Sequence, residues 1–276
     1  MILDGTLSKM VVSATQPISY QLPLSSNLVP LNPYLGQTLR LQFSGEIYCM
    51  NCTIRIKKSY QGGYCFPCMR RLARTDLCIV KPERCHFHLG SCREPEWGQS
   101  YCMIPHCVYL ANSSGIKVGI TRKNQVATRW IDQGAIAALP FFEVTTRRVS
   151  GLLEVAIAQH VNDKTNWRKM LMGNNEPIHL IEYKTELVAK LHDDIAAIRE
   201  QFGEECIKEL PNADIVEFSY PVLQYPQKVT SLSLDKQPDI KSKLLGIKGQ
   251  YLIFEAGVIN IRKYSGYKIS LDVSQA

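Results

Sequence analysis

The feature that most limits how this chain can fold is the crowding of its cysteines into one segment. Nine of the ten cysteines lie between Cys49 and Cys107, and only Cys206 lies outside that range. The same segment is rich in Gly, Pro and Arg and has no hydrophobic periodicity. Because it lacks the apolar side chains for a core of its own, it needs metal ions or disulfides to hold it together.

Four of these cysteines form two Cys-x2-Cys pairs that are twelve residues apart. Two such turns can place four thiolates tetrahedrally around Zn²⁺. A thioredoxin-type redox site needs one Cys-x2-Cys pair and would not explain the presence of two. The N-terminus lacks a basic region ahead of an apolar stretch, so we expect no secretory signal and a cytoplasmic protein, where disulfides are rare. We therefore predict a structural zinc site, with the ligands Cys49, Cys52, Cys65 and Cys68.

A second group of cysteines follows, with spacings of six, six and nine residues. Four thiolates from this group would complete another tetrahedral site, so the sequence predicts one or two zinc ions. The preferred ligands are Cys78, Cys85, Cys92 and Cys102, with His86, His88 and His106 as alternatives. We interpret Cys107 and Cys206 as packed thiols without a metal.

Charge is distributed unevenly along the chain. Residues 1–173 carry 20 basic and 10 acidic side chains, a net charge of +10, and residues 174–276 carry 12 and 15. A basic half that also contains the clustered cysteines favours DNA or RNA as a partner, and a charge bias that serves only solubility is the alternative. Several basic side chains are suited to phosphate contact. Those within or just after the first cysteine set are Arg55, Lys57, Lys58, Arg70 and Arg71, and those further along the chain are Lys117 and Arg122.

The chain is 45% hydrophobic, which is typical of a globular protein, and no apolar run approaches the roughly 18 residues of a membrane span. We expect an α+β fold in four parts. These are a β-rich segment 1–48, a zinc module 49–107, a mixed domain 108–173, and a helix followed by β-strands over 174–276.

Within the mixed domain, the expected order is β-hairpin, helix, strand, helix. Asn124 is the expected N-cap of the first helix and Ser150 that of the second. A longer amphipathic helix is expected over 185–206.

The two ends of the chain contain similar patterns. Residues 35–47 and 245–259 both read Leu-Gly, a spacer, an alternating strand, a glycine and a second strand. Two such hairpins would pair the β-rich ends into a small barrel or sandwich. A chance match of glycines between strands remains the alternative.

The stretch VYLANSSGIKVGITRKNQVATRW gives two strands and a helix with Arg129, and a later helix carries Glu154. Tyr109 lies in the first strand, and Val118-Gly119 follows nine residues later. This order resembles the GIY-YIG nuclease domain. The resemblance implies that Tyr109 positions or deprotonates water, that Arg129 contacts the scissile phosphate, and that Glu154 holds Mg²⁺ or Mn²⁺.

The second tyrosine of that motif is absent, and we place Val118 at its position. Valine cannot exchange a proton, so cleavage would rest on Tyr109 or on another residue such as His160. Longer stretches, PERCHFHLGSCREPEWG, RWIDQGAIAALP and DKTNWRKML among them, are similar to the bacterial domain-of-unknown-function family 2797. That family implies no activity.

Three hypotheses follow for the function. The chain is a candidate GIY-YIG-like endonuclease that depends on a divalent metal, or a nucleic-acid-binding protein with a degenerate nuclease fold. The third hypothesis is a zinc-stabilised scaffold that binds a protein partner through its acidic C-terminal segment. The concentration of positive charge in residues 1–173 favours nucleic-acid binding over the scaffold.

Overall fold

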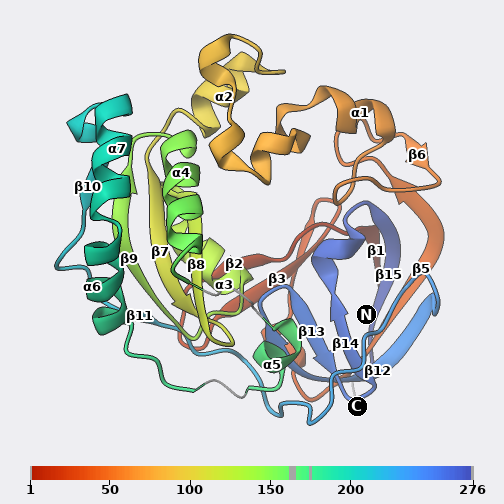
Figure 1. Ribbon diagram of the computed structural model, residues 1–276. Coiled ribbons are helices and arrows are strands. Elements are labelled where there is room, and N and C mark those ends of the chain that lie inside the picture. Colours follow the sequence, from red (N-terminus) through yellow and green to blue (C-terminus); the bar gives the residue numbers. More distant parts are fainter. Residues whose placement is uncertain (1, 162–165, 174–175, 275–276) are drawn as a thin grey trace.

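The computed structural model describes residues 2–161, 166–173 and 176–274 (Figure 1). It is a mixed α+β fold with three antiparallel sheets. No helix in these described ranges combines the length and apolar character needed to cross a membrane.

Both ends of the chain contribute to the largest sheet, which has seven strands in the order β1-β15-β5-β12-β13-β14, with β6 paired to β5. In its centre, Leu41 lies opposite Ile240 on one side and Leu271 on the other. The predicted pairing of the β-rich ends is thus confirmed. The strands are β1 (Ile2–Thr6), β5 (Thr38–Tyr48), β6 (Arg55–Ile56), β12 (Asp239–Lys248), β13 (Tyr251–Phe254), β14 (Gly257–Asn260) and β15 (Tyr267–Ser274).

Of the two arrangements expected for the β-rich ends, a barrel or a sandwich, the barrel is not formed. The described strands of the large sheet run from β1 to β14 without closing. A second sheet of three strands has the order β2-β3-β4, and Tyr20, Leu22 and Leu24 of β3 share one hydrophobic core with Leu41 and Ile240 of the large sheet. The bounds are β2 (Val11–Ser13), β3 (Ser19–Leu24) and β4 (Asn27–Pro30).

The expected repeat between the two ends is wrong for its first copy. Residues 38–48 form one continuous strand rather than a hairpin. Phe43 pairs with Ile269 and Ile47 with Tyr267, so three residues of β5 face a single residue of β15. Gly45, at φ +82°, lies in this bulge, which explains why a glycine there does not end the strand.

The mixed domain has the expected order of elements. Its sheet has the order β10-β9-β7-β8, β11 also pairs with β9, and every residue of the central strand β7 is buried. Val149, Leu153 and Ile157, spaced by four along α4, pack into the core of this sheet. The bounds are β7 (His106–Asn112), β8 (Ile116–Arg122), α3 (Val126–Asp132), β9 (Ala137–Val144), α4 (Arg147–Ala158), β10 (Ile207–Glu209) and β11 (Val216–Glu217).

Both predicted helix caps are wrong. Helix α3 is preceded by Gln125, because Asn124 is already part of a 3-10 turn. Helix α4 begins one turn earlier than expected, capped by Thr146, whose hydroxyl accepts a hydrogen bond from the backbone N–H of Val149. Ser150 lies inside that helix, and its hydroxyl donates to the carbonyl of Arg147.

The helix expected over 185–206 is two helices that meet at Leu191, and the second ends before Gly203 rather than at Cys206. The apolar stripe continues across the junction, since Leu187, Leu191 and Ile195 share one core. Hydrophobic spacing therefore did not reveal the break. The helices that follow α4 are α5 (Trp167–Leu171), α6 (Leu180–Lys190) and α7 (His192–Phe202).

The cysteine-rich segment crosses between the mixed domain and the large sheet at one end of the molecule (Figure 1). Apart from β6 and the start of β7, it consists of short helices and 3-10 turns. They are α1 (Phe66–Arg71), the turns Ala73–Thr75, Leu77–Ile79, Pro82–Arg84 and Phe87–Leu89, and α2 (Pro95–Tyr101).

Candidate functional site

The first cysteine set converges as its spacing predicts. The four sulfur atoms lie within 4.8 Å of one another, and Sγ of Cys52 is 3.7 Å from Sγ of Cys65. Backbone N–H groups point at the sulfurs: Cys65 donates to Sγ of Cys49 at 3.3 Å, and Cys68 donates to Sγ of Cys65 at 3.4 Å. The set is Cys49, Cys52, Cys65 and Cys68.

Electrostatics favour the thiolate form of one member of this cluster, Cys49. Burial alone would raise the pKa of Cys49, but hydrogen bonds from the backbone N–H groups of Cys52, Cys65 and Asn51 lower the pKa to about 6. A thiol that ionises this readily is a good zinc ligand at neutral pH. The geometry and the donor set both suit one four-coordinate structural zinc ion.

The second cysteine set lines one small cavity near α2. Cys78 and Cys85 are close enough that a hydrogen bond from Cys78 lowers the pKa of Cys85 to about 6. The most compact group of possible ligand atoms there is different from the predicted set, since Asp76, Cys78 and His86 lie within 4.8 Å of one another. The cysteines lining this cavity are Cys78, Cys85, Cys92 and Cys102.

Of the three alternative histidines, only His86 lines this cavity. The ring of His88 instead lies 2.9 Å from a guanidinium nitrogen of Arg148. His106 is buried on β7, where Nδ1 donates to the carbonyl of Ile104 at 2.7 Å and burial lowers the pKa to about 4.

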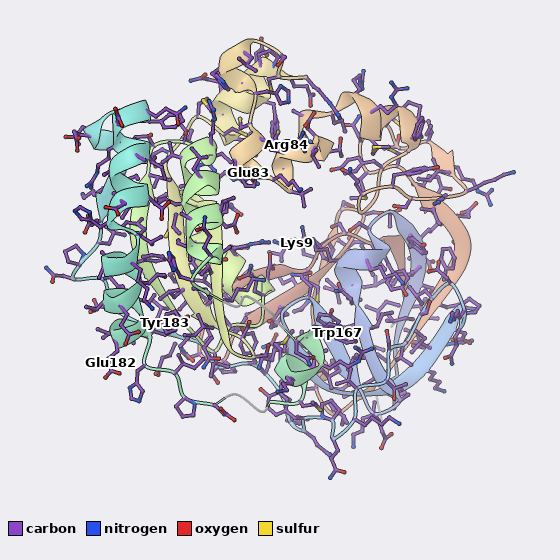
Figure 2. All side chains as sticks on the ribbon, in the orientation of Figure 1. Lys9, Glu83, Arg84, Trp167, Glu182 and Tyr183 are labelled. Atoms are coloured by element: carbon purple, nitrogen blue, oxygen red, sulfur yellow. The ribbon has the colours of Figure 1, made fainter. Side chains whose placement is uncertain are left out.

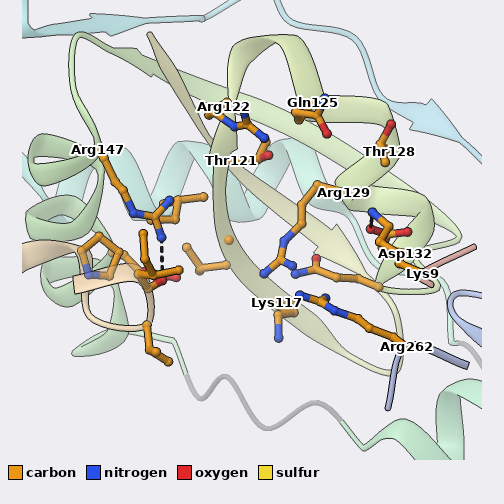
Figure 3. Close-up of a pocket in the computed structure, with 18 residues that line it drawn as sticks. Lys9, Lys117, Thr121, Arg122, Gln125, Thr128, Arg129, Asp132, Arg147 and Arg262 are labelled. Atoms are coloured by element: carbon orange, nitrogen blue, oxygen red, sulfur yellow. Dashed lines mark hydrogen bonds and ion pairs between the residues drawn. The ribbon is translucent and has the colours of Figure 1, made fainter. Parts of the chain in front are cut away.

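A larger cavity, with a volume of about 620 Å³, lies where three parts of the chain meet (Figure 3). Arg129 enters it from α3, and Arg262 enters it from the turn after β14. Other walls come from β8, α4 and the turns around Ile79 and Pro82. The charged residues that line it are Lys9, Lys117, Arg122, Arg129, Asp132, Arg147, Glu154 and Arg262.

The lining of this basic cavity carries six cations and two carboxylates among the described residues. One carboxylate, Asp132, is already engaged, because it pairs with Lys9 and accepts a hydrogen bond from Gln250 at 2.8 Å. Figure 2 shows Lys9 reaching into the space between the large sheet and the mixed domain. The cavity therefore favours an anionic ligand.

The structure thus places Arg129 and Glu154 in the same cavity, together with Lys117 and Arg122. Tyr109 is fully buried instead and does not line it.

The Tyr109 hydroxyl donates to Oε1 of Gln133 at 2.9 Å. Burial raises the pKa of Tyr109 to about 12, against the lowering effect of the Arg129 charge. Its ring packs on Gly119, where a Cβ atom would lie 2.5 Å from the hydroxyl oxygen.

The basic residues beside the first cysteine set lie outside this cavity. Arg55 forms an ion pair of 3.2 Å with Glu46. Lys58 lies over the ring of Tyr60 and Arg70 over the ring of Phe66, while Lys57 and Arg71 are exposed. These five exposed side chains belong to the segment with the first cysteine set, and we call them the basic surface of the zinc module.

Sequence reasoning missed three cations of the cavity: Lys9, Arg147 and Arg262. For Arg147 a signal existed, because it and Arg148 occupy the first turn of α4, where the helix dipole disfavours positive charge. Lys9 and Arg262 carry no local signal, since only the tertiary fold brings their distant segments to the cavity.

The chain has no significant match among curated proteins or among solved structures. A family model described as protein of unknown function, DUF2797, matches residues 36–269, which include both cysteine sets and most of the cavity. The chain therefore belongs to the DUF2797 family.

Proposed function

We propose that this protein binds nucleic acid through backbone phosphates held in the basic cavity. The observation that carries the proposal is the convergence of cations from separate elements in one concave site. Arg129 comes from α3, Arg147 from α4 and Arg262 from the turn after β14. Phosphate groups are the common biological anions that such guanidinium clusters recognise.

The shape of the charge distribution supports a polymeric ligand. The basic cavity and the basic surface of the zinc module lie on adjacent parts of the chain, because the cysteine-rich segment supplies Ile79 and Pro82 to the cavity wall. A strand with one phosphate in the cavity could extend toward Lys57 and Arg71. Either DNA or RNA satisfies this chemistry, since both present the same phosphate groups.

A second candidate function is phosphodiester hydrolysis in the same cavity. The observation that favours it is Glu154, which shares the cavity with Arg129. One carboxylate together with substrate phosphate oxygens suits Mg²⁺ or Mn²⁺, which would supply Lewis acid chemistry. Arg129 would then neutralise charge that develops on the phosphate.

The resemblance to GIY-YIG nucleases supports this second candidate in part. The hairpin β7–β8, helix α3, strand β9 and helix α4 follow one another in the order that the resemblance implies. The motif triplet that ends at Gly119 begins at Lys117, so Lys117 rather than Val118 stands at the place of the missing tyrosine. Both residues line the cavity, but only Lys117 offers a polar group there, since Val118 is an apolar residue of the hydrophobic core.

Binding is tested with labelled single- and double-stranded DNA and RNA oligonucleotides, by fluorescence anisotropy at increasing salt. The variant Lys117→Gln/Arg122→Gln/Arg129→Gln should lose at least tenfold in affinity. Its matched control, Arg55→Gln/Lys57→Gln/Lys58→Gln, removes the same charge from the zinc module and should lose less. Equal losses would mean that binding follows net charge and not the cavity.

Cleavage is tested with the same oligonucleotides in Mg²⁺ or Mn²⁺. Glu154→Gln should abolish cleavage while oligonucleotide binding persists, and Glu143→Gln should cleave normally, because Glu143 pairs with Lys123 outside the cavity. Binding without cleavage by the wild type would leave the non-catalytic function. Absence of binding at low salt would favour a protein scaffold, with the C-terminal segment as its contact surface.

A further inference from the structure

The turns between α1 and α2 have almost no apolar core. None of the residues 73–106, all of them described, belongs to a hydrophobic core cluster of the described chain. Val80 and Leu89 are 74% and 70% exposed, although both are apolar. A segment of this kind needs another source of folding free energy, and a bound metal ion is the usual one.

The second cysteine set lies inside these turns and surrounds a very small cavity. Cys78, Cys85, Cys92 and Cys102 all line a cavity with a volume of about 10 Å³, which is the space of one small sphere. Two of the four thiols, Cys85 and Cys102, are buried. Four thiols around a space of that size match the donor set of a structural zinc site.

The same turns form one wall of the basic cavity. A guanidinium nitrogen of Arg147 donates to the carbonyl of Ile79 at 2.6 Å, and the backbone N–H of Arg147 donates to the carbonyl of Cys102 at 2.8 Å. The first carbonyl belongs to the residue that follows Cys78, and the second belongs to Cys102 itself. The first turn of α4 is therefore attached to this set at two points.

A third contact reaches further along α4. Gly151 packs directly on the turn of Pro82 and Glu83, where a Cβ atom would lie 2.6 Å from the carbonyl carbon of Pro82. Figure 2 shows Glu83 in the turn next to α4. Glu154 lies three residues after Gly151 on the same helix, so the position of the turn affects both Arg147 and Glu154.

We propose that Cys78, Cys85, Cys92 and Cys102 bind a second zinc ion that holds this wall of the basic cavity in place. The metal site stands on its own observations, while its effect on ligand binding rests on the proposed function. The ion fixes the turn at 79–84, and the turn fixes the first two turns of α4. Zinc at this site thereby positions Arg147 and Glu154 without contacting the ligand.

A competing ligand set exists in Asp76, Cys78 and His86. This set offers three ligand atoms, one fewer than a structural zinc site takes, and Oδ2 of Asp76 already forms an ion pair of 2.6 Å with Arg93. The four thiols of the cysteine set, by contrast, all line the same small cavity. We therefore assign the ion to the cysteines.

Metal content tests the site. Wild-type protein produced in zinc-supplemented medium should contain two zinc ions per chain by elemental mass spectrometry. Cys85→Ser/Cys92→Ser should contain one, and both Cys206→Ser and Asp76→Asn should retain two. A single zinc ion in the wild type would overturn the assignment. It would also be overturned if Asp76→Asn lost an ion and Cys92→Ser/Cys102→Ser did not.

A titration of wild-type apoprotein with Co²⁺ covers the case in which the variants do not fold. Absorption from thiolate-to-cobalt charge transfer should rise linearly to two equivalents, because both sites supply thiolates. Saturation at one equivalent would overturn the second site.

Hydrogen exchange tests the effect on the cavity wall. In Cys85→Ser/Cys92→Ser, amides of residues 146–151 should exchange at least tenfold faster than in the wild type, whereas α7 should be unchanged. Oligonucleotide affinity should fall at least tenfold in the same variant. If the wild type binds no oligonucleotide, the proposed function fails. Zinc content and hydrogen exchange still decide whether the second zinc site exists and holds the wall. Unchanged hydrogen exchange at 146–151 would refute the positioning role.

Discussion

The hydroxyl of Tyr109 donates a hydrogen bond of 2.9 Å to Oε1 of Gln133, and of these two residues only Gln133 lines the basic cavity. The hydroxyl also interacts with Arg129, so Tyr109 contacts two residues of the cavity wall. In this arrangement Tyr109 supports the site from behind and keeps its proton, since burial raises its pKa to about 12. A role in proton transfer would require the hydrogen bond to break.

Tyr109→Phe should therefore act on stability and not on binding. Removing the hydroxyl leaves the Gln133 oxygen without its donor, and a lost buried hydrogen bond costs about 1 kcal/mol in the free energy of unfolding. Urea denaturation measures this loss, with Tyr101→Phe, at a 39% exposed position, as a control that should stay near the wild type. A tenfold loss of oligonucleotide affinity at unchanged stability would instead show that the hydroxyl contacts the ligand.

Arg129→Gln should weaken oligonucleotide binding and also flatten its dependence on salt. Each phosphate contact releases counterions, so losing one should lower the slope of log K against log salt by about 1. Anisotropy titrations at several salt concentrations measure this slope. An unchanged slope would mean that Arg129 makes no phosphate contact.

Local sequence patterns predicted those parts of the structure that depend on nearby residues. The stretch VYLANSSGIKVGIT gave the β7–β8 hairpin, and the paired Cys-x2-Cys spacing gave the four-thiol cluster. Both features are set within a few residues of chain, where turn chemistry and side-chain spacing act directly.

Features that depend on tertiary contacts were predicted less well. The alternation of residues 38–48 identified a strand but not its bulge, because the bulge is defined by the register of the distant strand β15. Lys9 and Arg262 enter the basic cavity from opposite ends of the chain, and neither has a local pattern that distinguishes it from a solvated lysine or arginine. Sequence order alone therefore identified one side of the cavity, formed by β8, α3 and α4.

Asp132→Ala should destabilise the protein more than the removal of an exposed ion pair. Asp132 is only 5% exposed, and its carboxylate bonds to both Lys9 and Gln250, which join the mixed domain to the large sheet. Hydrogen bonds to charged groups contribute about 1.5–3 kcal/mol, so we expect a loss of about 2 kcal/mol in urea denaturation. Asp239→Ala breaks the exposed pair with Arg40 and should cost less than about 1 kcal/mol; equal costs would contradict the difference in burial.

Gly151→Ala should destabilise the protein although alanine is the better helix former. The added methyl group would meet the backbone of Pro82, and overpacking of this kind costs about 1–3 kcal/mol. The control is Val155→Ala on the same helix, at a 46% exposed position, which should change the free energy of unfolding by less than about 1 kcal/mol. If Gly151→Ala proved stabilising, the turn at 79–84 would not pack on α4 as described.

Lys248 should make stability rise with pH above neutrality. It is fully buried on β12, and burial lowers its pKa in the folded state to about 8, against about 10.4 in the unfolded chain. Below pH 8 the lysine is protonated in both states and the cost of burying its charge is fully present. Between pH 8 and about 10.4 the unfolded state binds more protons, so the free energy of unfolding increases, by about 3 kcal/mol over the whole interval.

Urea denaturation from pH 7.5 to 9.5 measures this effect as a difference between the wild type and Lys248→Met. The rings beside the lysine, Tyr220 and Tyr225, have pKa values raised by burial and stay neutral in the folded state over that range. The wild type should gain stability relative to Lys248→Met as pH rises. Lys243→Met, on the exposed face of the same strand, should follow the wild type, and parallel curves for all three proteins would show that Lys248 titrates normally.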